Sequence, residues 1–152
     1  MGTPSPSHSR LMKLEELILD GADISDDAMF HLSKLPDLRS LSLMACVRLT
    51  ADGLSKLMSE ASQIPLDECL NLSNCSGLQG NAWTTYRKFN IKVVDVLPVL
   101  REFLAKGTKS IVISETRNLP AAEYDEFRHK MDASAREKWD QHVTYQPEVA
   151  RK

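Results

Sequence analysis

The residues of this sequence best suited to chemistry are its three cysteines, Cys46, Cys69 and Cys75. A thiol can act as a nucleophile, ligate a metal ion or form a disulfide, depending on its neighbours. An odd number of cysteines does not complete a set of disulfides, so we expect reduced thiols that pack mainly as small apolar side chains. Cys69 is the thiol that we would test for reactivity.

Motifs for metal binding or catalysis are absent from the sequence. The four histidines are scattered, and none shares the spacing of a zinc site with a cysteine or carboxylate. The chain contains no glycine-rich phosphate loop and no G-x-S-x-G motif. The acidic pairs Asp26-Asp27 and Asp125-Glu126 suit the first turns of helices, where negative charge is favourable. We therefore predict no enzyme activity, no cofactor and no metal site.

The composition is that of a nearly neutral protein. The 152 residues include 19 lysines and arginines and 21 acidic residues, which gives a formal charge of -2. This balance lacks the positive field that attracts nucleic acid. The polar residues 1–10 lack the apolar stretch of a secretory signal, and no later stretch is long and apolar enough to cross a bilayer. We expect a cytoplasmic or nuclear protein with no nucleic-acid or membrane partner.

The chain aligns with itself in four copies that are related by constant offsets. The first two copies are 24 residues apart and place Leu14, Leu17 and Leu19 on Leu38, Leu41 and Leu43. The third copy follows by 29 residues, with Leu70, Leu72, Cys75 and Leu78 on Leu41, Leu43, Cys46 and Leu49. A fourth, weaker copy follows by 41 residues, with Ile111, Ile113, Thr116 and Leu119 in these positions. The last offset also places Trp83 on Tyr124.

Each copy predicts a short strand followed by a turn. Leucines two residues apart, such as Leu17 and Leu19, point to one face of a strand, while the residues between them point to the other. A small residue then turns the chain inward, and this position holds Ala22, Cys46, Cys75 and Thr116. We therefore expect Cys46 and Cys75 to be buried and Cys69 to face outward.

Helices are predicted between the strands. In residues 25–35 the apolar positions repeat at helical spacing, and Pro36 follows as a stop. A second helix is expected around Leu54, and an inserted helix over residues 95–106 that ends at Gly107. For residues 90–94 the pattern leaves strand and helix open.

The pattern L-x-x-L-x-L-x-x-C-x-x-L resembles the leucine-rich-repeat family, in particular the cysteine-containing subclass found in F-box-type ubiquitin-ligase adaptors. The resemblance covers residues 11–78 well and residues 109–131 loosely. Asp67 and Thr108 replace the first leucine in the later copies, and no F-box motif occurs in the chain. The resemblance implies an α/β fold: a short leucine-rich-repeat solenoid of about four irregular strand–helix units, with a parallel sheet on the concave face and helices on the convex face.

The predicted organisation has three parts. Residues 1–10 form a flexible polar lead, and residues 11–131 form the solenoid with its inserted helix. Residues 132–152 form a C-terminal capping helix followed by a frayed tail. Pro120 suits the first turn of the last helix within the solenoid. The buried face of that helix is expected to include Tyr124, Phe127 and Met131.

Solenoids of this family commonly hold their ligands on the concave face, so the resemblance implies a non-catalytic protein–protein interaction module. Such a module would recognise a protein partner, as the substrate-reading unit of a ubiquitin-ligase adaptor does. The open strand over residues 14–19 allows either a monomer or an edge-paired dimer. The predicted partner-binding residues on the concave face are Glu16, Ile18, Asp20, Ser40, Ser42, Met44, Cys69, Asn71, Ser73, Ser110, Val112 and Ser114.

Two other functions compete with this prediction. Short leucine-rich-repeat proteins of similar size resemble some assembly factors of mitochondrial respiratory or ATP-synthase complexes, which gives a mitochondrial location as the alternative. Imaging of the chain with its N-terminus free separates the two locations. An enzymatic function would depend on Cys69 alone, and an ordinary thiol pKa without substrate-dependent labelling would exclude it.

Overall fold

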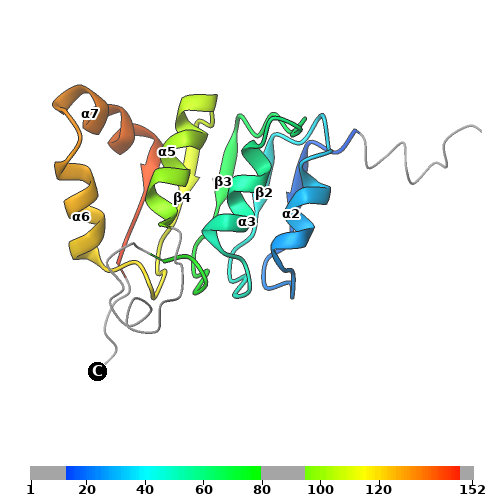
Figure 1. Cartoon of the computed structure of the whole chain (residues 1–152), viewed down its shortest axis with the longest axis horizontal. Helices are drawn as coiled ribbons and strands as arrows, with labels where there is room; N and C mark the ends of the chain where they lie inside the picture. Colours follow the sequence, from blue (N-terminus) through cyan, green and yellow to red (C-terminus); the bar gives the residue numbers. More distant parts are fainter. Residues whose placement is uncertain (1–12, 80–94, 148–152) are drawn as a thin grey trace, which may run out of the picture.

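The computed structural model describes residues 13–79 and 95–147 as an α/β structure in which strands and helices alternate (Figure 1). The strands are β1 (Glu16–Ile18), β2 (Ser40–Ser42), β3 (Cys69–Asn71), β4 (Ser110–Val112) and β5 (Val143–Thr144). The helices are α2 (Asp26–Leu32), α3 (Ala51–Ser55), the 3-10 helix η1 (Lys56–Met58), α5 (Val96–Lys106), α6 (Ala121–His129) and α7 (Ala133–His142). The predictions for residues 1–10, Trp83, residues 90–94 and the last five residues lie outside the described part.

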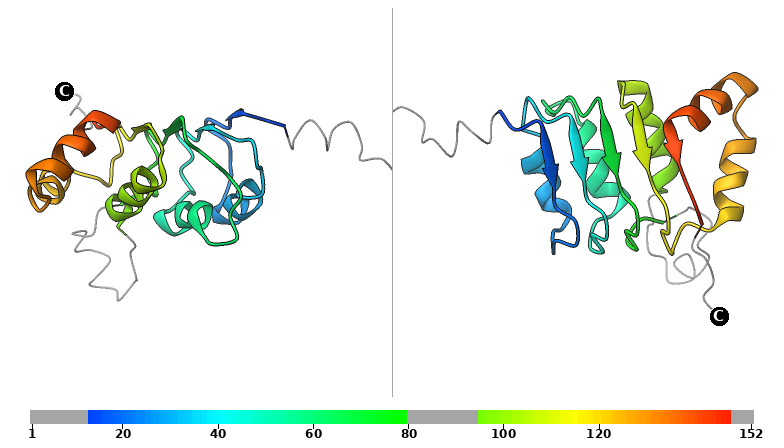
Figure 2. Two further views of the ribbon diagram at one scale, coloured as in Figure 1. Left: turned by 90° about the horizontal axis from the view of Figure 1, so that it is seen from above. Right: turned by 180° about the vertical axis from the view of Figure 1, so that it is seen from behind.

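The five described strands form one parallel sheet in their order along the chain. The helices lie on one side of this sheet, and no described helix covers the other side (Figure 2). Parallel neighbours require a crossover between consecutive strands, and the helical segments supply it. The apolar core therefore lies between the sheet and the helices, and the opposite face of the sheet is open.

The register of the sheet reproduces the offsets found in the sequence. Leu17 pairs with Leu41, Leu41 with Leu70, and Leu70 with Ile111, which are steps of 24, 29 and 41 residues. The side chains of Leu41, Leu70 and Ile111 are buried in the core beneath the helices. This confirms the self-alignment for the strands and the inward direction of the aligned apolar residues.

Each of the first four strands is followed by a turn in which one residue has a positive φ. These residues occupy one repeat position: Gly21, Ala45, Asn74 and Glu115, with φ of 71°, 60°, 61° and 56°. Their backbone N–H groups each donate to a carbonyl near the end of the neighbouring strand, over 2.7 to 2.9 Å. The same turn thus recurs four times and joins each strand to the next, although only Gly21 lacks the Cβ that opposes this conformation.

We expect Ala45→Gly to raise the free energy of unfolding by up to about 1 kcal/mol, because the left-handed conformation is strained for alanine and the larger chain entropy of glycine offsets only part of that strain. Gly21→Ala is the matched change in the opposite direction and should lower the free energy of unfolding. Urea unfolding followed by circular dichroism measures both variants. A change of the same sign in both would contradict a shared turn conformation.

The small residue after each turn is buried and links neighbouring units. The Cys46 thiol donates to the carbonyl of Leu19 over 3.2 Å, and the Cys75 thiol donates to that of Leu43 over 3.0 Å. Both cysteines are buried, as predicted. Thr116 holds this position in the next unit, but its buried hydroxyl has no hydrogen-bond partner among the described residues.

The helices agree with the sequence patterns except at the end of α2 and in α6. In α5 the Asp95 carboxylate accepts a hydrogen bond from the N–H of Leu97, and Gly107 ends the helix with φ of 120°, as predicted. Helix α2 ends at Leu32, three residues before the predicted end. It stops there because Pro36 has no N–H to donate to the Leu32 carbonyl, which accepts instead from the N–H of Leu35 over 3.1 Å.

In α6, Pro120 is the N-cap rather than part of the first turn. Asp125-Glu126 lie beyond that first turn, in which Glu123 supplies the negative charge.

The C-terminal end of the sheet differs from the prediction of a frayed tail. After α7 the chain forms β5, where Val143 pairs with Ile111 and adds a fifth copy of the strand. The indole N–H of Trp139, on α7, donates to the hydroxyl of Tyr124 over 2.8 Å, and Tyr124 stacks on Tyr145 with ring centroids 3.9 Å apart. This aromatic cluster closes the core beside β5.

Candidate interaction face

The open face of the sheet carries two rows of side chains that the register brings side by side. One row contains Glu16, Ser40, Cys69 and Ser110. The other contains Ile18, Ser42, Asn71, Val112 and Thr144. We call these residues the open face. Thr144 was not predicted, because no leucine pattern in the sequence indicates β5.

A shallow hollow of about 280 Å³ lies on the open face over β1, β2 and β3. Its lining residues are Glu16, Leu17, Ile18, Ser40, Leu41, Ser42, Cys69 and Asn71. Six of these residues were predicted to bind a partner; the other two are the leucines. The lining combines hydroxyl, thiol and amide groups with the side chain of Ile18, which is 61% exposed. The hollow therefore offers both hydrogen bonds and an apolar contact.

The other predicted residues lie outside this hollow. Met44 follows β2 and is exposed, while Val112 and Ser114 are half-buried on and after β4. Asp20 is exposed, but its carboxylate accepts hydrogen bonds from the Ser42 hydroxyl over 2.6 Å and from the N–H of Met44 over 3.0 Å. Asp20 thus ties the first unit to the second.

Ser73 differs from its prediction as an exposed partner-binding residue. It is only 9% exposed, and its hydroxyl accepts a hydrogen bond from the N–H of Ser114 over 3.2 Å. The alternation of inward and outward side chains stops before this residue, because the left-handed turn at Asn74 begins there. Ser73 therefore holds adjacent units together instead of facing a partner.

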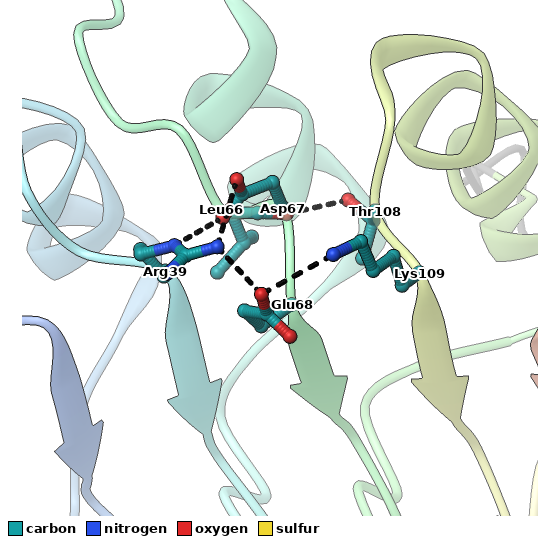
Figure 3. A network of polar contacts seen from close by, with 6 residues as sticks. All are labelled: Arg39, Leu66, Asp67, Glu68, Thr108 and Lys109. Carbon is teal, nitrogen blue, oxygen red and sulfur yellow. Dashed lines mark hydrogen bonds and ion pairs between the residues drawn. The ribbon is translucent and has the colours of Figure 1, made fainter.

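A row of charged residues borders the open face where the strands begin. Arg39 Nε lies 3.0 Å from Asp67 Oδ1, and Arg39 Nη2 lies 2.5 Å from Glu68 Oε1 (Figure 3). Lys109 Nζ reaches the same Glu68 oxygen over 3.4 Å. The hydrogen bond from Arg39 holds the pKa of Asp67 below its usual value, and the same bond raises the pKa of Arg39.

This charged row was missed, although the sequence contains a signal for it. Glu15, Arg39, Glu68 and Lys109 occupy one repeat position and alternate in sign along the row. Opposite charges on neighbouring strands attract, but such exposed ion pairs contribute little to stability. The row borders the open face with charges that are largely paired with one another.

Charged and metal-ligating side chains are sparse among the described residues of the open face. Within residues 13–79 and 95–147, no group of three or more His, Cys, Asp or Glu side chains is placed to hold a metal ion. Among the described residues Glu16 is the single charged residue that lines the hollow, so the lining offers no acid–base pair. No described helix has the length and apolar character needed to cross a bilayer. A comparison with models of known protein families finds no match for this chain.

The three thiols are expected to react at very different rates. Cys69 is half-buried in the hollow, whereas burial raises the pKa of Cys46 and raises that of Cys75 to about 11. Because the thiolate is the reactive form, a disulfide reagent at pH 8 should modify Cys69 in the folded protein and the other two only after unfolding. Mass spectrometry of the labelled peptides tests this, with Cys69→Ser as the control. Rapid labelling of Cys46 or Cys75 in the folded state would contradict the burial described.

Proposed function

We propose that the chain is a non-catalytic protein-interaction module, a leucine-rich-repeat solenoid whose open face recognises a segment of a partner protein. The strand register, the recurring left-handed turn and the buried small residue after it support this family resemblance. In such solenoids each unit packs on its neighbours, and the uncovered strands form an extended binding surface. In this proposal the module acts in the cytoplasm or nucleus, like the substrate-reading unit of a ubiquitin-ligase adaptor.

The observation that carries the proposal is the hollow on a sheet face that no described helix covers. Pockets for small molecules are usually about 300–1,000 Å³ and enclose most of the ligand. The hollow is at the lower limit of this range, at about 280 Å³, and it is open to solvent and spans three strands. Because it does not enclose a ligand, it suits a few side chains of a polypeptide that lies across the strands.

The hollow also indicates what such a segment would contain. Ile18 offers an exposed apolar surface, and Glu16 lies beside it on β1 with its side chain exposed. A partner segment with an apolar residue next to a basic residue would match this arrangement.

Ser40 supplies a hydroxyl and Asn71 a side-chain NH2 donor for hydrogen bonds to a partner backbone. The Asn71 side-chain oxygen already accepts from the N–H of Ser73, and the Ser42 hydroxyl donates to Asp20 and retains its acceptor lone pairs.

The test compares two substitutions of the same kind. Ile18→Asp places a charge in the hollow, whereas Val47→Asp places one on a turn outside it, and the two side chains are 61% and 59% exposed. We expect Ile18→Asp to lose at least about 2 kcal/mol of partner-binding free energy, as the loss of a central apolar contact does. We expect Val47→Asp to bind as the wild type does. Quantitative affinity capture from a lysate of the expressing cells measures the three proteins side by side.

Circular dichroism must first show that both variants fold. If Ile18→Asp and Val47→Asp retain the same partners in the same amounts, the open face is not the binding surface. If both lose them equally, the loss reflects a general effect of added negative charge, and the proposal fails as well.

A further inference from the structure

A second pocket lies on the helical side of the molecule, between α5 and α7. It has a volume of about 190 Å³, and its lining residues are Arg101, Leu104, Ala105, Met131, Ala135, Lys138 and Trp139. Leu104, Met131 and Trp139 are almost fully buried and form an apolar floor. The hydrogen bond from the Trp139 indole to the Tyr124 hydroxyl holds the Trp139 ring in place within the core. The pocket is thus separate from the open face and is supported by well-packed residues.

The charged residues that line this pocket carry one sign. Arg101 and Lys138 are both exposed, and neither forms an ion pair with any residue in the described part of the chain. No described acidic residue lines the pocket. Asp140, which follows Trp139 in the chain, forms an ion pair with Arg128, in which Nη2 lies 2.6 Å from Oδ2. The two cations border an apolar pocket without an ion-pair partner among the described residues, so they are available to pair with acidic groups of a ligand.

The size of the pocket indicates what could occupy it. A volume of about 190 Å³ is well below the about 300–1,000 Å³ of typical small-molecule pockets. It is close to the roughly 150 Å³ cavity that holds one benzene-sized group in a protein core. The pocket therefore accommodates a single large apolar side chain, with room at its border for acidic groups beside Arg101 and Lys138.

We propose that the pocket between α5 and α7 is a second peptide-binding site, which holds one apolar side chain of a partner segment flanked by acidic residues. Its charge preference is the opposite of that proposed for the open face. Residues 80–94 of this chain contain aromatic side chains, but they carry Arg87, Lys88 and Lys92 and no acid. The proposed occupant is instead a partner segment that supplies the acidic groups complementary to Arg101 and Lys138.

The test uses Trp139 as a reporter in the Trp83→Phe variant, since the chain has only two tryptophans. The probe is a synthetic peptide with a central phenylalanine between pairs of aspartates. One control peptide has serine in place of the phenylalanine, and another has lysines in place of the aspartates. We expect saturable fluorescence change with the probe and at least about tenfold weaker binding of each control, as expected when an apolar anchor or complementary charge is lost.

Three protein variants separate the contributions of charge and of the apolar pocket to probe binding. Combined Arg101→Glu and Lys138→Glu should weaken probe binding at least about tenfold, because attraction becomes repulsion. Arg117→Glu, an exposed arginine outside the pocket, should change it less than about twofold. Ala105→Leu adds bulk at the exposed wall of the pocket and should abolish the preference for phenylalanine over serine.

The proposal is overturned if the probe binds no better than the two control peptides, or if the charge reversal has no more effect than Arg117→Glu. It is also overturned if the fluorescence of Trp139 changes with protein concentration without peptide, because a second copy of the chain would then fill the pocket. None of these results depends on binding at the open face.

Discussion

Leu70→Ala is expected to lower the free energy of unfolding by about 3 to 4 kcal/mol, because the replacement of a buried leucine by alanine typically costs about 2 to 5 kcal/mol. Leu70 is fully buried in β3 and lies between Leu41 and Ile111 in the sheet. Alanine would leave a cavity lined by two neighbouring strands, which cannot close without shifting the register. Urea unfolding at fixed pH and temperature, followed by far-ultraviolet circular dichroism, measures the loss.

Leu17→Ala is the matched control for this prediction. Leu17 holds the same repeat position in β1, but it is half-buried because β1 is an edge strand among those described. Its replacement should lower the free energy of unfolding by only about 1 to 2 kcal/mol, since less apolar surface returns to water. Equal losses for the two variants would contradict a strand order in which β1 lies at the edge and β3 inside.

Gly77→Ala is expected to lower the free energy of unfolding by about 2 to 3 kcal/mol, although it adds only a methyl group. A Cβ at Gly77 would lie 2.9 Å from the carbonyl oxygen of Val47 and closer still to that of Leu49. Both oxygens belong to the backbone of the preceding unit, so the turns would have to move apart to make room. Thermal and urea unfolding should both show the loss.

Ser76→Ala tests whether the effect at Gly77 comes from this close approach. The Ser76 carbonyl accepts a hydrogen bond from the Asn118 side chain over 2.5 Å, and alanine retains that carbonyl. We expect a change within about 0.5 kcal/mol, as is usual away from packed contacts. A Gly77→Ala variant as stable as Ser76→Ala would show that the turns of adjacent units are not nested.

The strands and their register could be predicted because leucines two residues apart report directly which side chains enter the core. The offset from Leu41 to Leu70 is the register itself, because each copy occupies the same place in the sheet. The burial of Cys46 and Cys75 followed from the same alignment. Cys69 was expected to face outward, and it lies half-buried in the hollow.

Other features were missed for physical reasons that concern particular residues. Val143 in β5 and Tyr145 just after it hold the positions of the leucines, so the pattern was not recognised there. The left-handed turn is marked in the sequence by Gly21 and Asn74, but alanine and glutamate adopt it elsewhere because the hydrogen bonds between units impose it. Ser73 lies after β3, where the left-handed turn at Asn74 ends the alternation of side chains, which explains the error at Ser73.

The hollow itself could be predicted only in part. The sequence indicated which side chains share the open face, because they alternate with the leucines. It did not indicate that Asp20 is occupied by hydrogen bonds to the next unit, since those depend on the position of Met44 after β2. The pocket between α5 and α7 brings together residues more than 30 positions apart without any repeat, such as Arg101 and Lys138, so no sequence pattern indicated it.

The most direct test of the proposed function is photo-crosslinking from Cys69, the half-buried thiol in the hollow. A maleimide carrying a photoreactive benzophenone is attached to Cys69, and the labelled protein is irradiated in a lysate of the expressing cells. The control carries the same label at a cysteine introduced by Val47→Cys in the Cys69→Ser protein. We predict a discrete adduct with a partner polypeptide from Cys69 only, which Ile18→Asp abolishes. No adduct from Cys69, or the same adducts from both positions, would contradict recognition by the open face.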